Sequence, residues 1–159
     1  MADNIISPEK LTKHAQTWHD QQLTVVLTNG CFDLLHAGHL RTFIEAKKLG
    51  DILVVGLNSD RSVQSLKGPS RPLINQDERA LLVSALRPVD FVTIFDENNA
   101  MALLEKVRPS IYVKGGDYSM EILPERDILL RLNSEVVFIP LVEGVSTTEL
   151  VHKIKKANF

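Results

Sequence analysis

Five short apolar segments alternate with helical patterns along this 159-residue chain, and this alternation constrains the fold more than any other feature. The apolar, β-rich segments lie at residues 23–28, 52–57, 91–95, 111–113 and 136–139. Strands that are apolar on both faces and separated by helices form parallel sheets covered on both sides. Right-handed crossovers then predict an α/β fold with a doubly wound, five-stranded parallel sheet, Rossmann-like, in the strand order 3-2-1-4-5.

Helical patterns fill the intervals at residues 38–49, 59–66, 76–86, 100–107 and 124–133, and a last helix is expected at residues 147–156. An extra N-terminal helix is predicted at residues 8–22, because Ser7 can cap a helix that has Pro8 in its first turn. We expect a single domain, residues 1–159, in which residues 1–22 form an N-terminal helical extension.

Composition and charge exclude several classes of protein. The net charge of −2 provides no broad basic surface for nucleic acid. No apolar run approaches the roughly 20 residues of a membrane span. The single cysteine, Cys31, rules out an internal disulfide and fits a reducing compartment. We therefore expect a cytoplasmic protein whose partners are small molecules, and not nucleic acid or membranes.

The fold rule places a ligand site where the strand order reverses. Ligands of doubly wound sheets bind beyond the carboxyl ends of the strands at this point, which here lies between the first and fourth strands. Residues 29–39 and 114–118, which follow those two strands, should therefore meet. Gly115 and Gly116 in the second segment allow the backbone to approach a ligand closely.

Two histidines three residues apart, His36 and His39, stand with Gly38 between them where the first strand passes into a helix. Residues at this spacing share a helix face, and free N–H groups at a helix start attract phosphate. The pair therefore predicts a site that holds a triphosphate, with ordinary capping or surface histidines as the alternative. No third His, Cys or carboxylate stands at ligand spacing, so we predict no metal site built by the protein.

A second phosphate-binding segment is indicated near the C-terminus. Ser146 and Glu149 form a capping box around Thr147 and Thr148, and this pattern alone accounts for a helix start. The same N–H groups and hydroxyls can also bind phosphate.

The sequence GCFDLLHAGH at residues 30–39 resembles the GxFDxxHxGH signature of the cytidylyltransferase-like nucleotidyltransferases. GVSTT at residues 144–148 resembles their second signature, GISTT, with Val145 in place of Ile. Within this superfamily the segments 58–63, 67–72 and 114–118 are similar to those of adenylyltransferases that form ADP-heptose. Many relatives carry the domain behind a sugar kinase, and this chain resembles the stand-alone form.

The resemblance implies transfer of AMP from ATP to D-glycero-D-manno-heptose 1-phosphate, with Mg²⁺ present, for lipopolysaccharide core biosynthesis. It implies catalytic roles for His36, His39, Lys67 and Arg79, of which Lys67 also contacts the acceptor phosphate. It implies a nucleotide site formed by Asn29, Gly30, Cys31, Phe32, Gly38, His39, Lys114, Gly115, Asp117, Val145, Ser146, Thr147 and Thr148. Family members often form homodimers, so we expect one here.

Several alternatives stay open at this point. Lys67 could be a solvated loop lysine, and Arg79 could form only a salt bridge with a neighbouring carboxylate. Asp33 could orient its loop, contact the acceptor or help to hold the metal. The nucleotide could be CTP and the acceptor glycerol 3-phosphate or a similar alcohol phosphate. A nucleotide-binding module without turnover is the rival from a different class.

Overall fold

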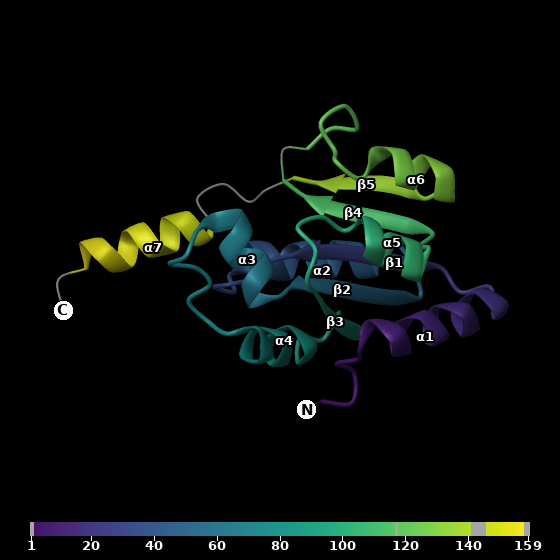
Figure 1. Cartoon of the computed structure of the whole chain (residues 1–159), viewed down its shortest axis with the longest axis horizontal. Coiled ribbons are helices and arrows are strands. Elements are labelled where there is room, and N and C mark those ends of the chain that lie inside the picture. Colours follow the sequence, from purple (N-terminus) through teal and green to yellow (C-terminus); the bar gives the residue numbers. More distant parts are fainter. Residues whose placement is uncertain (1, 117, 141–145, 158–159) are drawn as a thin grey trace.

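A computed structural model describes residues 2–116, 118–140 and 146–157 of the chain. Its centre is a five-stranded parallel sheet with the order β3-β2-β1-β4-β5, as predicted. The strands are β1 (Val25–Gly30), β2 (Ile52–Asn58), β3 (Phe91–Phe95), β4 (Ile111–Gly115) and β5 (Glu135–Ile139). Helices cover both faces of this sheet (Figure 1).

Seven helices are found in the described part of the chain. They are α1 (Pro8–Asp20), α2 (Ala37–Lys47), α3 (Asp60–Lys67), α4 (Gln76–Ser84), α5 (Met101–Val107), α6 (Arg126–Leu132) and α7 (Thr147–Lys156). Four of them begin at a serine or asparagine side chain that accepts a backbone N–H, and these caps are Ser7, Ser59, Asn75 and Ser146. No described helix has the length and apolar character needed to cross a membrane.

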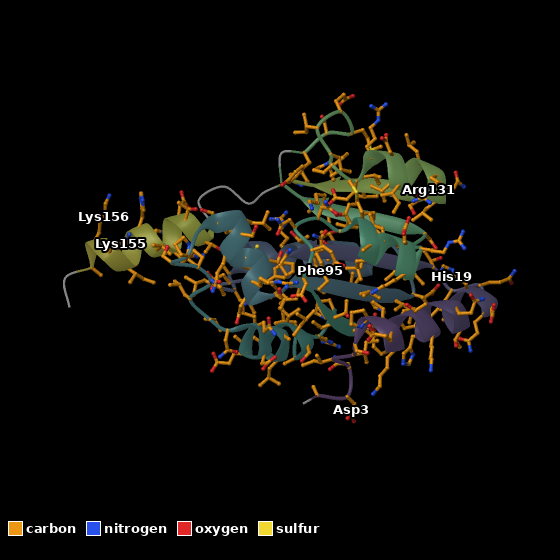
Figure 2. The ribbon with its side chains drawn as sticks, viewed as in Figure 1. Asp3, His19, Phe95, Arg131, Lys155 and Lys156 are labelled. Atoms are coloured by element: carbon orange, nitrogen blue, oxygen red, sulfur yellow. The ribbon has the colours of Figure 1, made fainter. Side chains whose placement is uncertain are left out.

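Two apolar clusters lie on opposite faces of the sheet. The first contains Leu11, Ala15 and Trp18 of α1 together with residues of α5 and α6, so the N-terminal helix buries one face in this cluster. The second contains Phe43 of α2 and Val83 of α4. Phe95, at the end of β3, lies in the middle of the molecule, whereas Lys155 and Lys156 lie on α7, which extends away from the sheet (Figures 1 and 2).

The first strand begins and ends two residues later than predicted. Leu23 belongs to the turn after α1, because its N–H bonds to Trp18 O and the preceding residue, Gln22, has a left-handed φ of 59°. The strand continues through Asn29 and Gly30, which pair with residues of β2. Both residues therefore belong to the carboxyl end of β1, and not to the loop that follows it.

Two further boundaries differ from the prediction. β4 extends to Gly115, because Lys114 and Gly115 pair with β5. The expected helix at residues 124–133 begins only at Arg126, which leaves Glu125 ahead of the first turn. Residues near both positions belong to the site described next.

Candidate active site

A cavity of about 620 Å³ opens at the carboxyl ends of β1 and β4, where the fold rule places the ligand site. The end of β1 and the segment after it contribute residues 28–33 together with His36, Gly38 and His39. The end of α3 contributes Lys67, the end of β4 contributes Lys114 and Gly115, and the start of α7 contributes residues 146–148. These segments, far apart in the sequence, therefore meet around one space.

The two histidines lie together at the start of α2. Their rings stack with centroids 3.7 Å apart and planes 20° from parallel. His36 is the N-cap, and its Nδ1 accepts the backbone N–H of His39 at 3.4 Å. Because Nδ1 is the acceptor, the proton of a neutral His36 ring is on Nε2, where it can be donated to a ligand.

The packing of Phe32 explains why the loop begins with glycine. Phe32 has a left-handed φ of 46°. The centre of its ring lies 5.2 Å from that of His39, in an edge-to-face arrangement, and 5.1 Å from that of Phe43. A Cβ at Gly30 would lie 2.9 Å from Cζ of Phe32. Because glycine has no side chain, residue 30 leaves room for the Phe32 ring that packs against His39.

Burial disfavours the charged form of both histidines. Burial is the main cause that lowers the pKa of His39 to about 4, and repulsion from His36 and Lys67 adds to it. Burial also lowers the pKa of His36 below its usual value. Neutral imidazoles can act as hydrogen-bond donors, and a nearby anion would raise their pKa values.

Lys67 is exposed at the last position of α3, so it belongs to the helix end and not to the following loop. It lines the cavity, and its positive charge acts to lower the pKa values of both His39 and Cys31. This places an unburied ammonium group beside the histidine pair.

Lys114 extends into the same cavity from β4. Its Nζ lies 3.4 Å from Asn29 Oδ1 and 3.3 Å from the hydroxyl of Tyr112, and it stands 5.3 Å from the ring centre of Tyr118. Burial lowers the pKa of Lys114, and the nearby charge of Glu125 opposes this effect. The sequence analysis did not single out Tyr112, whose hydroxyl donates to Asn29 Oδ1 at 2.6 Å.

Arg79 is placed differently from the prediction. Its side chain is fully buried, does not line the cavity and forms hydrogen bonds with other groups of the protein. It donates to the backbone carbonyls of Cys31, Asn58 and Ile74 and pairs with Asp60 Oδ1 at 2.7 Å. Four of its five N–H groups thus have partners within the protein, and the arginine joins the chain after β1, the end of β2 and the start of α4.

Asp33 also uses its carboxylate to hold neighbouring chain. Oδ1 accepts the backbone N–H groups of Leu73 at 2.7 Å and Ile74 at 3.1 Å. Oδ2 forms an ion pair with Arg71 Nη2 at 2.6 Å, although the direction of this contact does not meet hydrogen-bond geometry. Of the three roles considered for Asp33, these contacts favour orientation of the loop.

Cys31 lines the cavity without the features of a nucleophile. Burial raises the pKa of its thiol, and the charges of Lys67 and Arg79 only partly oppose this. A raised pKa keeps the sulfur protonated and unreactive. Asp117 and Val145, which were also predicted to contact nucleotide, lie outside the described residues.

Several cavity residues were not found by sequence reasoning, namely Thr42, Asn98, Asn99 and Glu125. Asn98 and Asn99 follow β3, and polar residues at the carboxyl end of a parallel strand are a usable signal. Glu125 gave no such signal, because an acidic residue in the expected first turn of a helix is ordinary.

The sheet order, the paired histidines and the switch-point cavity define a Rossmann-like α/β protein with a candidate ligand site at a helix start. The sequence model of the cytidylyltransferase-like family matches residues 27–154. The chain therefore belongs to the cytidylyltransferase-like family.

Curated relatives and solved structures agree with this membership. The chain is 50% identical over 131 residues to the bifunctional protein HldE of Syntrophotalea carbinolica, which covers 82% of this chain and 27% of the relative. It is 42% identical over 153 residues to the bifunctional protein HldE of Gluconobacter oxydans, covering 96% of this chain and 32% of the relative. The chain thus spans about a third or less of the length of these relatives.

Two solved structures share the fold. The lipopolysaccharide core biosynthesis protein of Thermoplasma volcanium is 30% identical with a TM-score of 0.61, and the match covers 76% of this chain and 97% of that one. The pantoate-beta-alanine ligase of Francisella tularensis is 12% identical with a TM-score of 0.58, covering 95% and 76% of the two chains. At that identity the ligase supports the fold alone.

Proposed function

We propose that this protein transfers AMP from ATP to D-glycero-β-D-manno-heptose 1-phosphate and releases pyrophosphate, forming ADP-heptose for lipopolysaccharide core biosynthesis. The observation that carries the proposal is the meeting of His36, His39 and Lys67 at one cavity with Lys114 and Gly115. The similarity to the HldE proteins and to the lipopolysaccharide core biosynthesis protein supports this choice of acceptor over an alcohol phosphate with CTP.

The reaction needs positioning and charge neutralisation more than proton transfer. A phosphate oxygen of the acceptor attacks the α-phosphorus of ATP, the bond to the bridging oxygen breaks, and pyrophosphate leaves with that electron pair. Because the attacking phosphate is already anionic, no general base is required. In our proposal His36 and His39 donate to phosphate oxygens at the α2 start, while Lys67 draws in the acceptor phosphate.

Mg²⁺ is expected to accompany the triphosphate. Among residues 2–116, 118–140 and 146–157, no group of three or more His, Cys, Asp or Glu side chains is arranged to hold a metal ion. The described residues therefore do not fit a dedicated magnesium site. Mg²⁺ is commonly held by substrate phosphates and water, with few protein ligands.

An assay with the purified protein tests the proposal. The protein is incubated with Mg²⁺, heptose 1-phosphate and either ATP or CTP, and pyrophosphate and the nucleotide sugar are quantified. We expect both products with ATP, and neither when the acceptor is omitted. Nucleotide binding with no pyrophosphate in any mixture would establish a binding module instead, and preference for CTP with glycerol 3-phosphate would establish the alternative enzyme.

The remaining expectations about the protein's setting are separate proposals. We propose small-molecule substrates, a cytoplasmic location and a homodimer, which cell fractionation and analytical ultracentrifugation would test. Nucleic acid is not expected to bind, since the net charge is −2.

A further inference from the structure

Glu125 is a buried carboxyl group on the cavity wall that the proposed chemistry does not use. Its exposed fraction is 2%. Oε1 accepts the backbone N–H of Ala100 at 3.1 Å. Oε2 is buried as well and has no hydrogen-bond partner among the residues that the structure describes.

A structural role accounts for the contact of only one of the two carboxylate oxygens of Glu125. Accepting the N–H of Ala100 ties the chain ahead of α6 to the start of α5, and one oxygen is enough for that. A buried polar atom left without a partner is unfavourable, and more so when it is charged. The second oxygen is thus a free acceptor at the cavity, available to a ligand that brings a donor.

The nearest lysine does not take up this acceptor. Burial lowers the pKa of Lys114, and the charge of Glu125 partly opposes this shift, so the two groups are close enough to interact. However, the hydrogen-bond contacts of Lys114 Nζ within the described chain are Asn29 Oδ1 and the Tyr112 hydroxyl, and it forms no ion pair with Glu125 there.

The connections of Glu125 lead toward α3, the helix that ends at Lys67. Ala100 directly follows Asn98 and Asn99, which both line the cavity. The Asn98 amide donates to Ser65 Oγ at 3.0 Å, and Ser65 stands two residues before Lys67 on α3. Glu125 is therefore linked through the start of α5 to the helix that carries the lysine proposed to bind the acceptor phosphate.

We infer that Glu125 is a specificity-determining residue whose free carboxylate oxygen accepts a hydrogen bond from a hydroxyl of the acceptor sugar. The inference rests on the proposed function and adds a subsite to it. Sugars supply many hydroxyl donors, and a site built to pair a hydroxyl rejects analogues that lack it. The amides of Asn98 and Asn99 provide further polar groups on the same wall.

Glu125→Gln is the sharpest test, because the amide oxygen can still accept the N–H of Ala100 while the other atom becomes a donor. We expect the KM for heptose 1-phosphate to rise roughly 10- to 150-fold, the range for a lost hydrogen bond to a charged group. The KM for ATP should change less than about twofold. Glu135→Gln is the matched control, because that glutamate is exposed at the opposite end of β5, and it should leave both constants unchanged.

Acceptor analogues identify the hydroxyl and separate this role from a structural one. One monodeoxy heptose 1-phosphate should lose as much affinity with the wild-type protein as heptose 1-phosphate loses with Glu125→Gln. The two losses should not add when combined, because they remove the same contact. Additive losses, or a KM change that falls on ATP, would overturn the inference.

A measurement on the wild-type protein alone keeps the inference testable even where the variant does not fold. The hydroxyl that donates to Glu125 cannot be replaced by fluorine, which has no proton, so the deoxyfluoro analogue should bind as poorly as the deoxy one. Restoration of binding by fluorine at every position would contradict the inference. Wild-type protein inactive with heptose 1-phosphate would instead refute the proposed function itself, and the inference with it.

Discussion

His36 and His39 stack face to face at the start of α2, with 3.7 Å between their ring centres. The spacing of three residues brings the rings onto one side of the first turn, and the cap role of His36 holds its ring against the helix end. Two protonated imidazoles at this distance would repel each other, which together with burial favours the neutral form of His39. An arriving triphosphate would reverse that preference by supplying negative charge.

The histidine pair should make stability depend on pH. The folded pKa of His39, about 4, is below the unfolded value near 6.5, so the unfolded chain binds more protons between these two values. The stability contribution is complete above pH 6.5 and falls as the pH is lowered toward 4. Thermal unfolding from pH 7 to 4 should show a smaller decline for His39→Gln than for the wild-type protein.

A matched control is available for this titration. His152 is an exposed histidine on α7, and His152→Gln should follow the wild-type curve. NMR titration of the ring signals reports the same effect directly, and ATP should raise the pKa of His39. A wild-type pH profile in His39→Gln would show that burial does not control this ring.

His39→Ala should reduce turnover while leaving the fold intact. The ring is placed to donate to a phosphate oxygen, and loss of one transition-state donor costs at least about a hundredfold in kcat. Pyrophosphate release at saturating ATP and acceptor measures the loss, and circular dichroism verifies the fold. Unchanged kcat would remove His39 from the proposed catalytic group.

The order of the strands and the place of the cavity could be predicted from sequence, and particular residues show why. Residues 29–39 and 114–118 follow the strands on either side of the switch point, so the fold rule alone brings them together. The HxxH spacing likewise predicts the shared face of His36 and His39, because it depends only on helix geometry.

Arg79 and Glu125 could not be placed this way, because their roles depend on segments remote in sequence. Arg79 is on the predicted helix, yet its side chain turns inward to carbonyl groups of Cys31 and Asn58, 48 and 21 residues away. Glu125 is distinguished only by burial and by its contact with Ala100. Neither feature leaves a periodic pattern in the chain.

Lys67→Ala should chiefly impair use of the acceptor. The ammonium group is exposed and lines the cavity, so it can attract the acceptor phosphate without contributing to the core. We expect the KM for heptose 1-phosphate to rise about tenfold or more, consistent with a lost hydrogen bond between charged groups. Lys10→Ala, an exposed lysine on α1, is the control. Equal KM values in both variants would favour a solvated lysine.

Arg79→Lys should destabilise the protein although the charge is retained. A lysine cannot reproduce the planar set of bonds to the carbonyls of Cys31 and Ile74 and to Asp60, so buried acceptors lose partners, at a cost of about 2–4 kcal/mol. Arg131→Lys is the control, because its pair with Glu105 is exposed at the rim of the molecule (Figure 2) and should change stability by less than about 1 kcal/mol. Urea unfolding measures both variants. Arg79 donates to the carbonyl of Cys31 in the segment that leads to His36, so Arg79→Lys should also raise the KM for ATP. Equal stability of the two variants would show that the hydrogen bonds of Arg79 are dispensable for the fold.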